Sequence, residues 1–575
     1  MALLTSFNQL LIFGDSLTDP GNVFNVTVAT NAIFPGIVPI SPAVPPYDSR
    51  GRITNGDPLG LDSRSTWADF LADSLGFEVQ QSTALALYDP AVQPSPPFMP
   101  PADPSAPAPV LAVLGPNGPD LELNTFFNGA TAVENINFAF GGATSGDTNV
   151  SDTRIPGVLR QIDAFLADLA FSQNSANPQA LYTIWGGSND FDPIASGTPV
   201  DPNGPVSNAE TAIASLHGAG GRTFLVHNLP DLGIRPFLES ISDSPSEVLA
   251  IREEYSTVTQ EYNELLTAKL ADLSQTISDI QIVEVQVYDL LTFVRDNASF
   301  FGFTNIDDSF LTQTSGSADP DEFIFWDGEH PTRAAHQILG EFTHQTLTAS
   351  LDSQRFLIGT TDVDMLVGGE EDNRIYGRHG NDLLISGAGD DRVLGGSGND
   401  LINGGAGNDT LSGGSGSDRI NGSVGRDVLI GGGGDDFIQG GFGNDILIGT
   451  SGSNTLEGGH GNDWYRGGRG PDTFVFGRDL LDGRVEVDTI VGYGTEDFID
   501  LDAYREAGGS VSAQRIYSRK VQLTLTDSFG IRDRVSVFGD SQALSDLSSR
   551  FQTSTNSLGL LNFFRSFGAF GNFRN

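Results

Sequence analysis

Hydrophobic and polar positions follow two different periods along this chain. In roughly the first 350 residues, short apolar runs of strand length alternate with stretches in which apolar side chains recur every three or four residues, as on one face of a helix. The apolar runs occupy 10–13, 181–185, 223–226 and 280–287, and the helical patterns cover 155–169 and 251–273. Strands that alternate with helices predict a parallel sheet covered by helices on both faces.

A period of nine residues replaces this pattern over 359–475. The segment divides into thirteen unbroken blocks of nine, in which position 8 is always apolar, position 6 is always Asp or Asn, and position 4 is Gly in eleven blocks. It holds 33 of the 70 glycines of the chain. An inward side chain at position 8 can stack on its equivalents in neighbouring blocks, while glycine permits the tight turns between them. A disordered or fibrous glycine-rich segment would not keep that apolar position.

Carbonyl oxygens of such turns, together with the carboxylate at position 6, form the all-oxygen shell that Ca²⁺ prefers. The segment resembles the RTX calcium-binding nonapeptide array. The resemblance implies a parallel β-roll with two nonapeptides per turn and several structural Ca²⁺ ions between the turn loops. The first two blocks lack the position-4 glycine, and Asn373 and Asn454 replace Asp, so we expect no ion there. The expected calcium ligands are Asp382, Asp391, Asp400, Asp409, Asp418, Asp427, Asp436, Asp445, Asp463 and Asp472.

Charge and cysteine usage narrow the functional classes. The chain carries 74 acidic and 30 basic side chains, a net charge of -44, and no cysteine. Such a field repels phosphate backbones, so nucleic acid is not an expected partner, whereas a hard cation is. A disulfide framework and a cysteine nucleophile are excluded. We expect no transmembrane segment, because no apolar run reaches 18 residues, and no cleaved N-terminal signal peptide, because no basic region precedes 10–13.

Candidate catalytic residues stand at both ends of the first region. Ser16, in FGDSLTDPGN (13–22), follows the first apolar run, where a hydroxyl would be presented at the open edge of a sheet. A Gly-Asp-Ser turn is also ordinary helix-capping chemistry. In FWDGEHPT (325–332), Asp327 lies three residues before His330, a spacing that lets the carboxylate orient the imidazole for a nucleophile. A structural or metal-binding histidine is the alternative, with His336 six positions away.

Two glycine-rich segments, 137–145 and 185–190, follow apolar runs and can offer donors to an oxyanion, although each alone is more often a turn. In this order the four motifs resemble the SGNH/GDSL hydrolase family, in its lipase, phospholipase and haemolysin-like branch. The resemblance implies a flavodoxin-like three-layer α/β/α fold with Ser16 as nucleophile, Gly142 and Asn189 in the oxyanion hole, and the Asp327–His330 pair. No G-x-S-x-G is present, so an α/β-hydrolase elbow is not expected.

A proline-rich stretch interrupts the first region. Residues 90–119 hold 11 of the 30 prolines, which predicts an extended surface loop without helix or central strand. Its side chains suggest no chemistry, so we interpret it as a solvated insertion rather than a lid over the active site.

These patterns divide the chain into an SGNH/GDSL hydrolase domain (1–350), an RTX β-roll with its cap (351–500), and a β-rich, Phe-rich tail (501–575) with a type I secretion signal. We expect a secreted bacterial esterase or lipase that cleaves acyl esters or lipids without a catalytic cofactor. The resemblance implies export by the type I secretion machinery, with calcium folding the repeats outside the cell. A polysaccharide O-acetyl esterase and a non-enzymatic calcium-binding surface or adhesion protein remain the alternatives.

Overall fold

The structure is a computed structural model of the chain, which forms two compact units, Met1–Asp352 and Ser353–Asn575. The boundaries predicted from the sequence, at 350 and 500, stay predictions. The structure describes residues 7–14, 66–77, 80–81, 84–88, 109–115, 118–125, 136–137, 139, 143–146, 157–196, 200–242, 244–310, 319–327, 329–352, 356–477, 485–506, 508–526 and 532–551.

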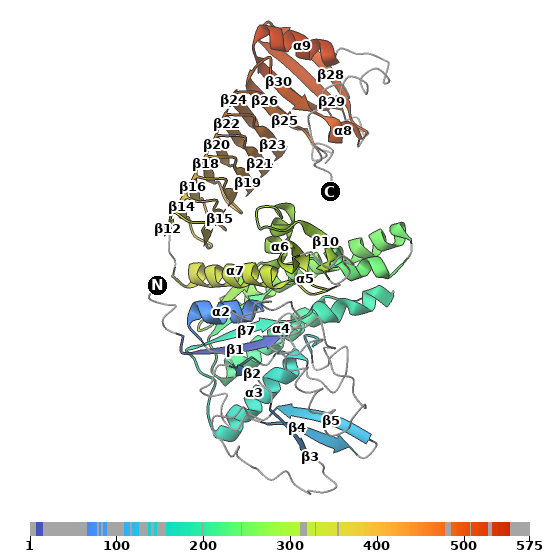
Figure 1. The fold of residues 1–575 in the computed structure, drawn as a ribbon, viewed down its shortest axis with the longest axis vertical. Helices are drawn as coiled ribbons and strands as arrows, with labels where there is room; N and C mark the ends of the chain where they lie inside the picture. The colour runs from blue at the N-terminus through green and yellow to red at the C-terminus, as the bar shows by residue number, and fades with distance from the viewer. Residues whose placement is uncertain are drawn as a thin grey trace. The chain divides into compact units, whose positions relative to one another are not determined.

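A six-stranded parallel sheet forms the centre of the first unit (Figure 1). Every residue of its strands β1 and β7 is buried, which explains why both segments are continuous apolar runs in the sequence. Strand order along the sheet is β2 (Gln80–Gln81), β6 (Ile136–Asn137), β1 (Gln9–Gly14), β7 (Ala180–Trp185), β8 (Thr223–His227) and β9 (Gln281–Val285).

Helices cover both faces of this sheet, so the predicted α/β architecture is confirmed. Helix α2 packs against α7 on one side of the sheet, and α4 packs against α3 and α5 (Figure 1). Gly340 permits the close approach of α2 to α7, because a Cβ atom there would lie 2.5 Å from Phe70 Cβ. The helices are α2 (Trp67–Leu75), α3 (Val158–Ser172), α4 (Asn203–Ala219), α5 (Pro245–Thr276), α6 (Val287–Asp296) and α7 (Arg333–Asp352).

Shorter elements complete the first unit. Strands β10 (Asn305–Ser309) and β11 (Phe323–Phe325) form a separate parallel pair. Turns of 3-10 helix lie at η3 (Ser188–Ser196), η4 (Leu232–Ile234), η5 (Pro236–Ser240) and η7 (Pro320–Glu322). No helix in the described part of the chain is long and apolar enough to cross a membrane.

The expectation of an extended loop without a central strand over 90–119 was wrong for its C-terminal part. Strands β3 (Ala84–Tyr88), β4 (Pro109–Gly115) and β5 (Gly118–Thr125) form a three-stranded sheet with β4 in the middle. Pro109 is the first residue of β4 and Pro119 belongs to the edge strand β5, and these are positions where a missing N–H is tolerated. Residues 89–108 lie outside the described residues.

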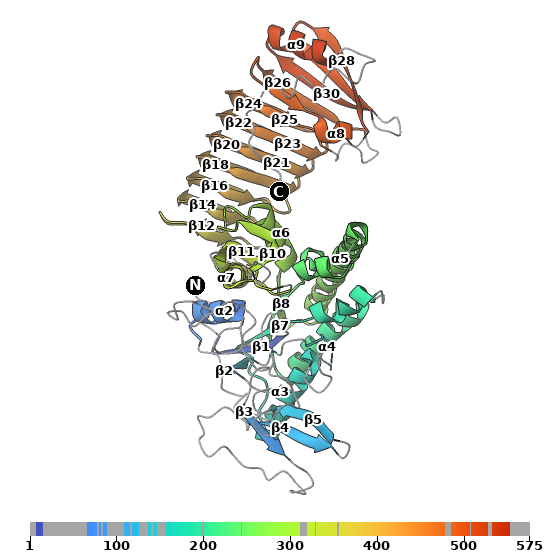
Figure 2. The ribbon, with the colours of Figure 1, turned by 45° about the vertical axis from the view of Figure 1, so that its right-hand side comes forward.

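The second unit is a parallel β-roll, as the nonapeptide pattern predicts (Figure 2). Each strand pairs with the strand 18 residues further on, for example Leu411 with Leu429, so two nonapeptides make one coil. The side chains at position 8 from Ile375 to Phe474 are at most 1 % exposed and form a continuous core. Stacking of equivalent side chains is therefore what holds successive coils together.

The strands alternate between two sheets. One sheet contains β12 (Phe356–Ile358), β14 (Arg374–His379), β16 (Arg392–Ser397), β18 (Thr410–Ser415), β20 (Val428–Gly433), β22 (Ile446–Ser451) and β24 (Trp464–Arg469). The other contains β13 (Met365–Val367), β15 (Leu383–Ile385), β17 (Leu401–Asn403), β19 (Arg419–Val424), β21 (Phe437–Phe442), β23 (Thr455–His460), β25 (Thr473–Val475) and β27 (Phe498–Asp500).

A cap follows the last nonapeptide without a break in the first of these sheets. Strands β26 (Val487–Tyr493) and β30 (Arg532–Gly539) continue it in parallel, and β29 (Lys520–Thr526) and β28 (Ser510–Tyr517) complete it in antiparallel order. The helices here are α8 (Asp502–Glu506) and α9 (Ser541–Phe551). The Phe-rich end that was predicted to hold the secretion signal lies outside the described residues.

Candidate active site and calcium-binding roll

A compact loop after β11 brings Asp327 and His330 together. The Trp326 N–H donates to the His330 carbonyl at 2.8 Å and the Thr332 N–H to the Ile324 carbonyl at 2.8 Å, so the chain folds back on β11 before α7 begins. Within this loop, His330 Nδ1 lies 2.9 Å from both carboxylate oxygens of Asp327. The imidazole is thus held through Nδ1, the arrangement expected from the spacing in the sequence.

Backbone N–H groups also hold the Asp327 carboxylate in place. Its Oδ1 accepts the N–H groups of Glu329 and His330, both at 2.8 Å. Burial raises the pKa of Asp327, but the neighbouring His330, its side-chain hydrogen bond and the two backbone donors outweigh burial and leave the pKa below its ordinary value. Asp327 is therefore ionised at neutral pH and can stabilise a positive charge on the imidazole.

Two of the predicted site residues, Ser16 and Asn189, follow β1 and β7 in the sequence. These strands pair in parallel with Gly14 opposite Trp185, and the Gln161 side chain on α3 binds both the N–H and the carbonyl of Gly14, at 3.0 and 2.9 Å. Ser16 comes two residues after Gly14 in sequence, and both Ser16 and Gly142 lie outside the described residues. Asn189, at the start of η3, donates from Nδ2 to the Ala143 carbonyl at 3.0 Å.

Asp190 joins the two glycine-rich segments, a role that the sequence did not reveal. Its carboxylate accepts the Ser145 N–H at 2.7 Å and the Ser145 hydroxyl at 3.0 Å, and Asn208 on α4 donates to the same hydroxyl at 2.9 Å. Burial raises the pKa of Asp190, and the Ser145 hydrogen bonds only partly oppose this. The one sequence feature that pointed to Asp190 was its position directly after Asn189. Asp190 thus holds 143–145 against the residue predicted to bind the oxyanion.

A pocket opens beside His330 at this end of the sheet. Apolar side chains predominate in its walls, including Trp185, Leu232 and Leu339. Its polar lining includes Asn189 from η3, His330, and Arg235, which lies between η4 and η5. One cavity is therefore bordered by a candidate oxyanion donor, a candidate base and a fixed cation. An apolar cavity with a few converging polar groups is typical of a small-molecule binding site.

The two fully buried histidines near this pocket are structural. His336 Nδ1 accepts the Trp67 N–H at 3.3 Å, and burial and then the proximity of His330 lower its pKa to about 3. His227 stacks on Trp185 at a ring distance of 5.1 Å, and burial lowers its pKa to about 3 as well. Among the described residues, no group of three or more His, Cys, Asp or Glu side chains could hold a metal. The alternative of a His330–His336 metal site has no support among these residues.

In the roll, the ten predicted calcium ligands are all buried and form a ladder along the coils. An Oδ1 atom of each accepts the N–H of the residue 18 positions before it; Asp400, for example, binds the Asp382 N–H at 2.9 Å. The same contact in the last coil reaches 25 residues ahead, where Asp488 accepts the Asp463 N–H at 2.9 Å.

The second carboxylate oxygen has the environment that a cation requires. In nine of the aspartates Oδ2 is buried and, within the part of the chain that the structure describes, has no hydrogen-bond donor: these are Asp382, Asp391, Asp400, Asp409, Asp418, Asp427, Asp436, Asp445 and Asp472. Burial raises the pKa of Asp391, Asp400 and Asp427 to about 7. A buried charge without a partner is costly, so a bound cation fits here.

Glycine at position 1 leaves space for this arrangement. A Cβ atom at Gly395 would lie 2.3 Å from Asp400 Oδ2 and 2.6 Å from the Gly413 carbonyl oxygen. Each such turn combines backbone carbonyl oxygens with a single aspartate carboxylate. The residues present therefore fit Ca²⁺, which takes backbone carbonyls and carboxylates alike.

Comparisons with known proteins agree with both halves of this description. The family model described as GDSL-like Lipase/Acylhydrolase matches residues 10–342, and that of the RTX calcium-binding nonapeptide repeat matches five overlapping stretches between 358 and 474. A GDSL esterase/lipase of Arabidopsis thaliana is 26% identical over 375 residues, which cover 57% of this chain and 87% of that protein.

Two further comparisons are more limited. An inactive GDSL esterase/lipase-like protein of Arabidopsis thaliana is 26% identical over 188 residues, or 29% of this chain and 44% of that protein. The extracellular lipase LipA from Serratia marcescens aligns over 70% of this chain and 71% of its own at 12% identity with a TM-score of 0.12, a score too low to carry an argument.

Proposed function

Because the chain belongs to the GDSL-like lipase/acylhydrolase family, we propose that it hydrolyses acyl esters through a Ser16–His330–Asp327 triad. The family and the repeats make it a hydrolase of ester substrates that carries calcium-binding repeats. The triad rests on one observation, the hydrogen bond that holds His330 Nδ1 to Asp327 at 2.9 Å.

In this mechanism His330 acts first as a base and then as an acid. With Nδ1 bound to Asp327, Nε2 takes the hydroxyl proton as the Ser16 oxygen attacks the ester carbonyl. The tetrahedral intermediate collapses when the imidazolium gives that proton to the leaving alcohol, which produces an acyl-enzyme. A water molecule, deprotonated by His330, then attacks the acyl carbon, and the acid leaves as Ser16 regains its proton.

The oxyanion of both intermediates requires fixed donors. We assign this role to the N–H groups of Ser16 and Gly142 and to the Asn189 side-chain amide, each of which typically contributes about 3–4 kcal/mol. Asn189 uses one amide hydrogen on the Ala143 carbonyl, which orients the side chain and leaves its second amide hydrogen for the substrate. The contacts of Gln161 to Gly14 and of Asp190 to Ser145 fix the backbone on either side of this arrangement.

The roll serves stability and export in this proposal. Bound Ca²⁺ neutralises the stacked carboxylates, and its binding free energy then contributes to the folding of the roll. Millimolar calcium outside the cell would therefore fold a segment that stays open during passage through a type I secretion machinery. The buried Oδ2 atoms of the ladder support calcium dependence of folding. We propose that the triad itself works without a metal.

An ester chain-length series tests the proposal. The full-length protein and Ser16→Ala are assayed on p-nitrophenyl acetate, butyrate, octanoate and palmitate, in calcium and after EDTA. We expect turnover that disappears in Ser16→Ala with an unchanged circular dichroism spectrum, and a loss of roll structure in EDTA. Full activity of Ser16→Ala would refute the nucleophile assignment.

The same series separates the alternatives. Activity confined to acetate, with hydrolysis of acetyl-xylan, would identify a polysaccharide deacetylase instead. Absence of turnover on every ester, with calcium-dependent folding intact, would leave a non-enzymatic calcium-binding surface protein.

A further inference from the structure

Arg235 is a buried cation in the wall of the candidate active-site pocket. Its side chain is 8 % exposed, and it borders the same cavity as His330 and Asn189. Neither the family motifs nor the triad mechanism uses it. Burial of a guanidinium costs several kcal/mol unless acceptors compensate its charge, so each face and nitrogen of this group needs a partner.

The contacts of Arg235 account for only part of the guanidinium. Nε donates to the Leu232 carbonyl at 3.1 Å, and Nη1 lies 3.7 Å from Asp192 Oδ1, which is longer than a hydrogen bond. The rings of Phe237 and Tyr255 lie 4.7 and 4.8 Å from its central carbon. Nη2 is buried and has no acceptor among the residues that the structure describes.

Asp192 compensates the positive charge incompletely. Its own burial, partly opposed by Arg235 and reinforced by Glu329, raises the pKa of Asp192 to about 6. At mildly acidic pH this carboxyl is therefore partly neutral. His336, the other basic side chain beside His330 in the pocket wall, stays neutral because its pKa is about 3. Arg235 is thus the one permanently charged cation among the described residues that line the pocket, and the same lining includes the carboxyl groups of Asp231 and Glu329. Asp231 is engaged by the Gly233 N–H and the Ser256 hydroxyl, at 2.8 and 2.7 Å.

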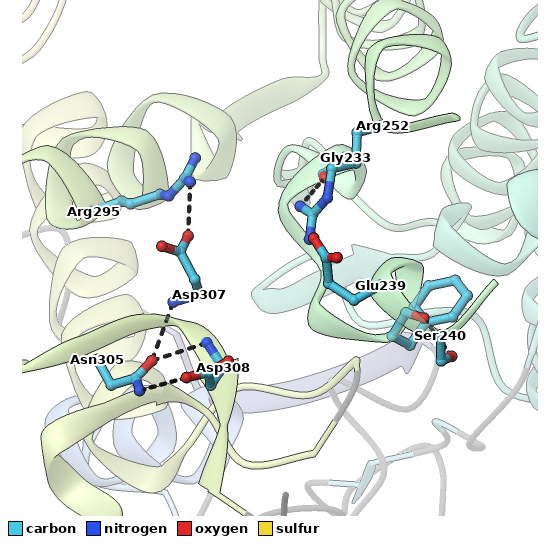
Figure 3. A network of polar contacts seen from close by, with 9 residues as sticks. Gly233, Glu239, Ser240, Arg252, Arg295, Asn305, Asp307 and Asp308 are labelled. Carbon is cyan, nitrogen blue, oxygen red and sulfur yellow. Dashed lines mark hydrogen bonds and ion pairs between the residues drawn. The ribbon is translucent and has the colours of Figure 1, made fainter. Parts of the chain in front are cut away.

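The segment that carries Arg235 is held rigidly in place. Arg252 on α5 donates to the Gly233 carbonyl at 2.8 Å and to Glu239 at 2.9 Å, which ties η4 and η5 to the helix (Figure 3). Asp231 caps η4 through the Gly233 N–H at 2.8 Å and accepts the Ser256 hydroxyl at 2.7 Å. The guanidinium is therefore positioned before any ligand arrives, which lowers the entropic cost of binding.

We propose that Arg235 binds an anionic oxygen group, a phosphate or a carboxylate, that the substrate carries near its scissile ester. A planar guanidinium matches these groups in shape and charge better than it matches a neutral carbonyl. This inference rests on the proposed function, because it places the anion in the pocket of the Asp327–His330 pair. It predicts that the preferred esters are anionic, and it makes Arg235 a determinant of specificity and not of the chemical step.

Matched butyryl esters test this. The full-length protein in calcium is assayed on 1-butyrylglycerol, 1-butyrylglycerol 3-phosphate, O-butyryl glycolate and dibutyrylphosphatidylcholine, which are respectively neutral, phosphate monoester, carboxylate and lipid phosphodiester. The measured quantity is the ratio of kcat/KM on each anionic ester to that on the neutral ester. We expect Arg235→Gln to lower this ratio about 10- to 100-fold, mainly through KM, and Arg235→Lys to lower it less. The ester with the largest drop identifies the source of the anion.

Two controls separate specificity from folding. Arg295→Gln removes a cation that pairs with Asp307 at 3.0 Å, and Arg252→Gln loosens the attachment of η4 and η5 (Figure 3). Arg295→Gln should leave the ratio within about twofold of wild type, whereas Arg252→Gln should lower it by less than Arg235→Gln does, because the guanidinium is then present but less firmly positioned. An equal loss on neutral and anionic esters in Arg235→Gln would assign the residue to structure alone and overturn the proposal, as would an unchanged ratio.

A binding experiment tests the inference even if no ester is cleaved. Glycerol 3-phosphate and inorganic phosphate are titrated calorimetrically into wild-type protein and Arg235→Gln. Binding of glycerol 3-phosphate that weakens at least tenfold in the variant supports the anion site even if the esterase proposal fails. Equal binding to both proteins, or binding to neither, excludes a phosphate ligand, and the proposal is then overturned unless Arg235→Gln lowers the ratio for the carboxylate ester.

Discussion

Replacement of Asp327 by Asn changes one atom of the pair that orients His330. In the native loop, Asp327 Oδ1 accepts the backbone N–H groups of Glu329 and His330, each at 2.8 Å. In Asp327→Asn the amide oxygen must keep these two donors, so the NH₂ group faces His330 Nδ1. The amide oxygen at the Oδ1 position also lies near Nδ1, but a hydrogen on Nδ1 would then face the hydrogens of the NH₂ group at the Oδ2 position. Nδ1 is therefore expected to become the acceptor, and Nε2 then carries the hydrogen. The imidazole is left in the tautomer that cannot act as a base.

We expect this exchange to lower kcat about 10⁴-fold, which corresponds to about 5.5 kcal/mol of transition-state stabilisation. The loop should keep its conformation, since the two backbone hydrogen bonds persist, and the melting temperature should stay within a few degrees of wild type. Initial rates on p-nitrophenyl butyrate and a thermal melt in calcium measure both quantities. Glu329→Gln removes a carboxylate from the same loop without touching Nδ1 and should cost less than about tenfold. A well-folded Asp327→Asn protein with more than a tenth of wild-type activity would refute the tautomer argument.

Two further predictions concern stability. Gly432→Ala should destabilise the roll by several kcal/mol in denaturant titrations, because φ is +120° and the new Cβ would lie 2.0 Å from the Gly414 carbonyl oxygen. In Gly433→Ala the new Cβ meets its nearest atom at 3.5 Å, so this variant should be nearly as stable as wild type. Equal stability of the two variants would contradict the argument. His227 and His336 have pKa values of about 3 in the folded protein, below the ordinary 6.5 of the unfolded chain. As pH falls, the unfolded chain therefore binds protons first. The contribution of these histidines to the stability of the first unit is full above about pH 6.5 and is lost progressively toward pH 3. The free energy of unfolding should fall by roughly 2 kcal/mol per histidine at pH 5. Thermal melts followed by the fluorescence of the adjacent tryptophans should show a weaker dependence of stability on pH in His336→Gln. An unchanged dependence would exclude this cause.

The sequence predicts those features that depend on residues close together in the chain or on an exact repeat. The period of nine specifies both the buried position 8 and the carboxylate at position 6, because every coil meets only its neighbours. The Asp327–His330 contact likewise spans three residues of one loop, so its spacing alone indicates it. Asn189 was singled out through its motif, a glycine-rich turn after a buried strand, and its part in an oxyanion hole stays a prediction.

Features assembled from distant segments were not predictable. The surroundings of Arg235 come from η4, η5 and α5, and no local pattern records that its Nη2 lies buried without an acceptor among the described residues. The Asp190–Ser145 contact joins segments 45 residues apart. The proline-rich stretch misled for a different reason: a proline excludes a strand only where the ladder needs its N–H, and Pro109 stands at the first position of β4.

The carboxylate ladder of the roll has a direction. Every coil satisfies N–H groups of the coil before it, so each layer is completed by its successor along the chain, and the final nonapeptides are completed by the cap, where Asp488 and Asp497 accept the N–H groups of Asp463 and Asp472. A second ladder, at position 5, runs the other way: Asp390, for example, accepts the N–H of Asn408, 18 residues further on, at 2.8 Å. Each inner coil is therefore held by the coils on both sides, and unfolding of the roll should begin at its first coil, which has a neighbour on one side only in the described sheets, and not at the end that the cap completes.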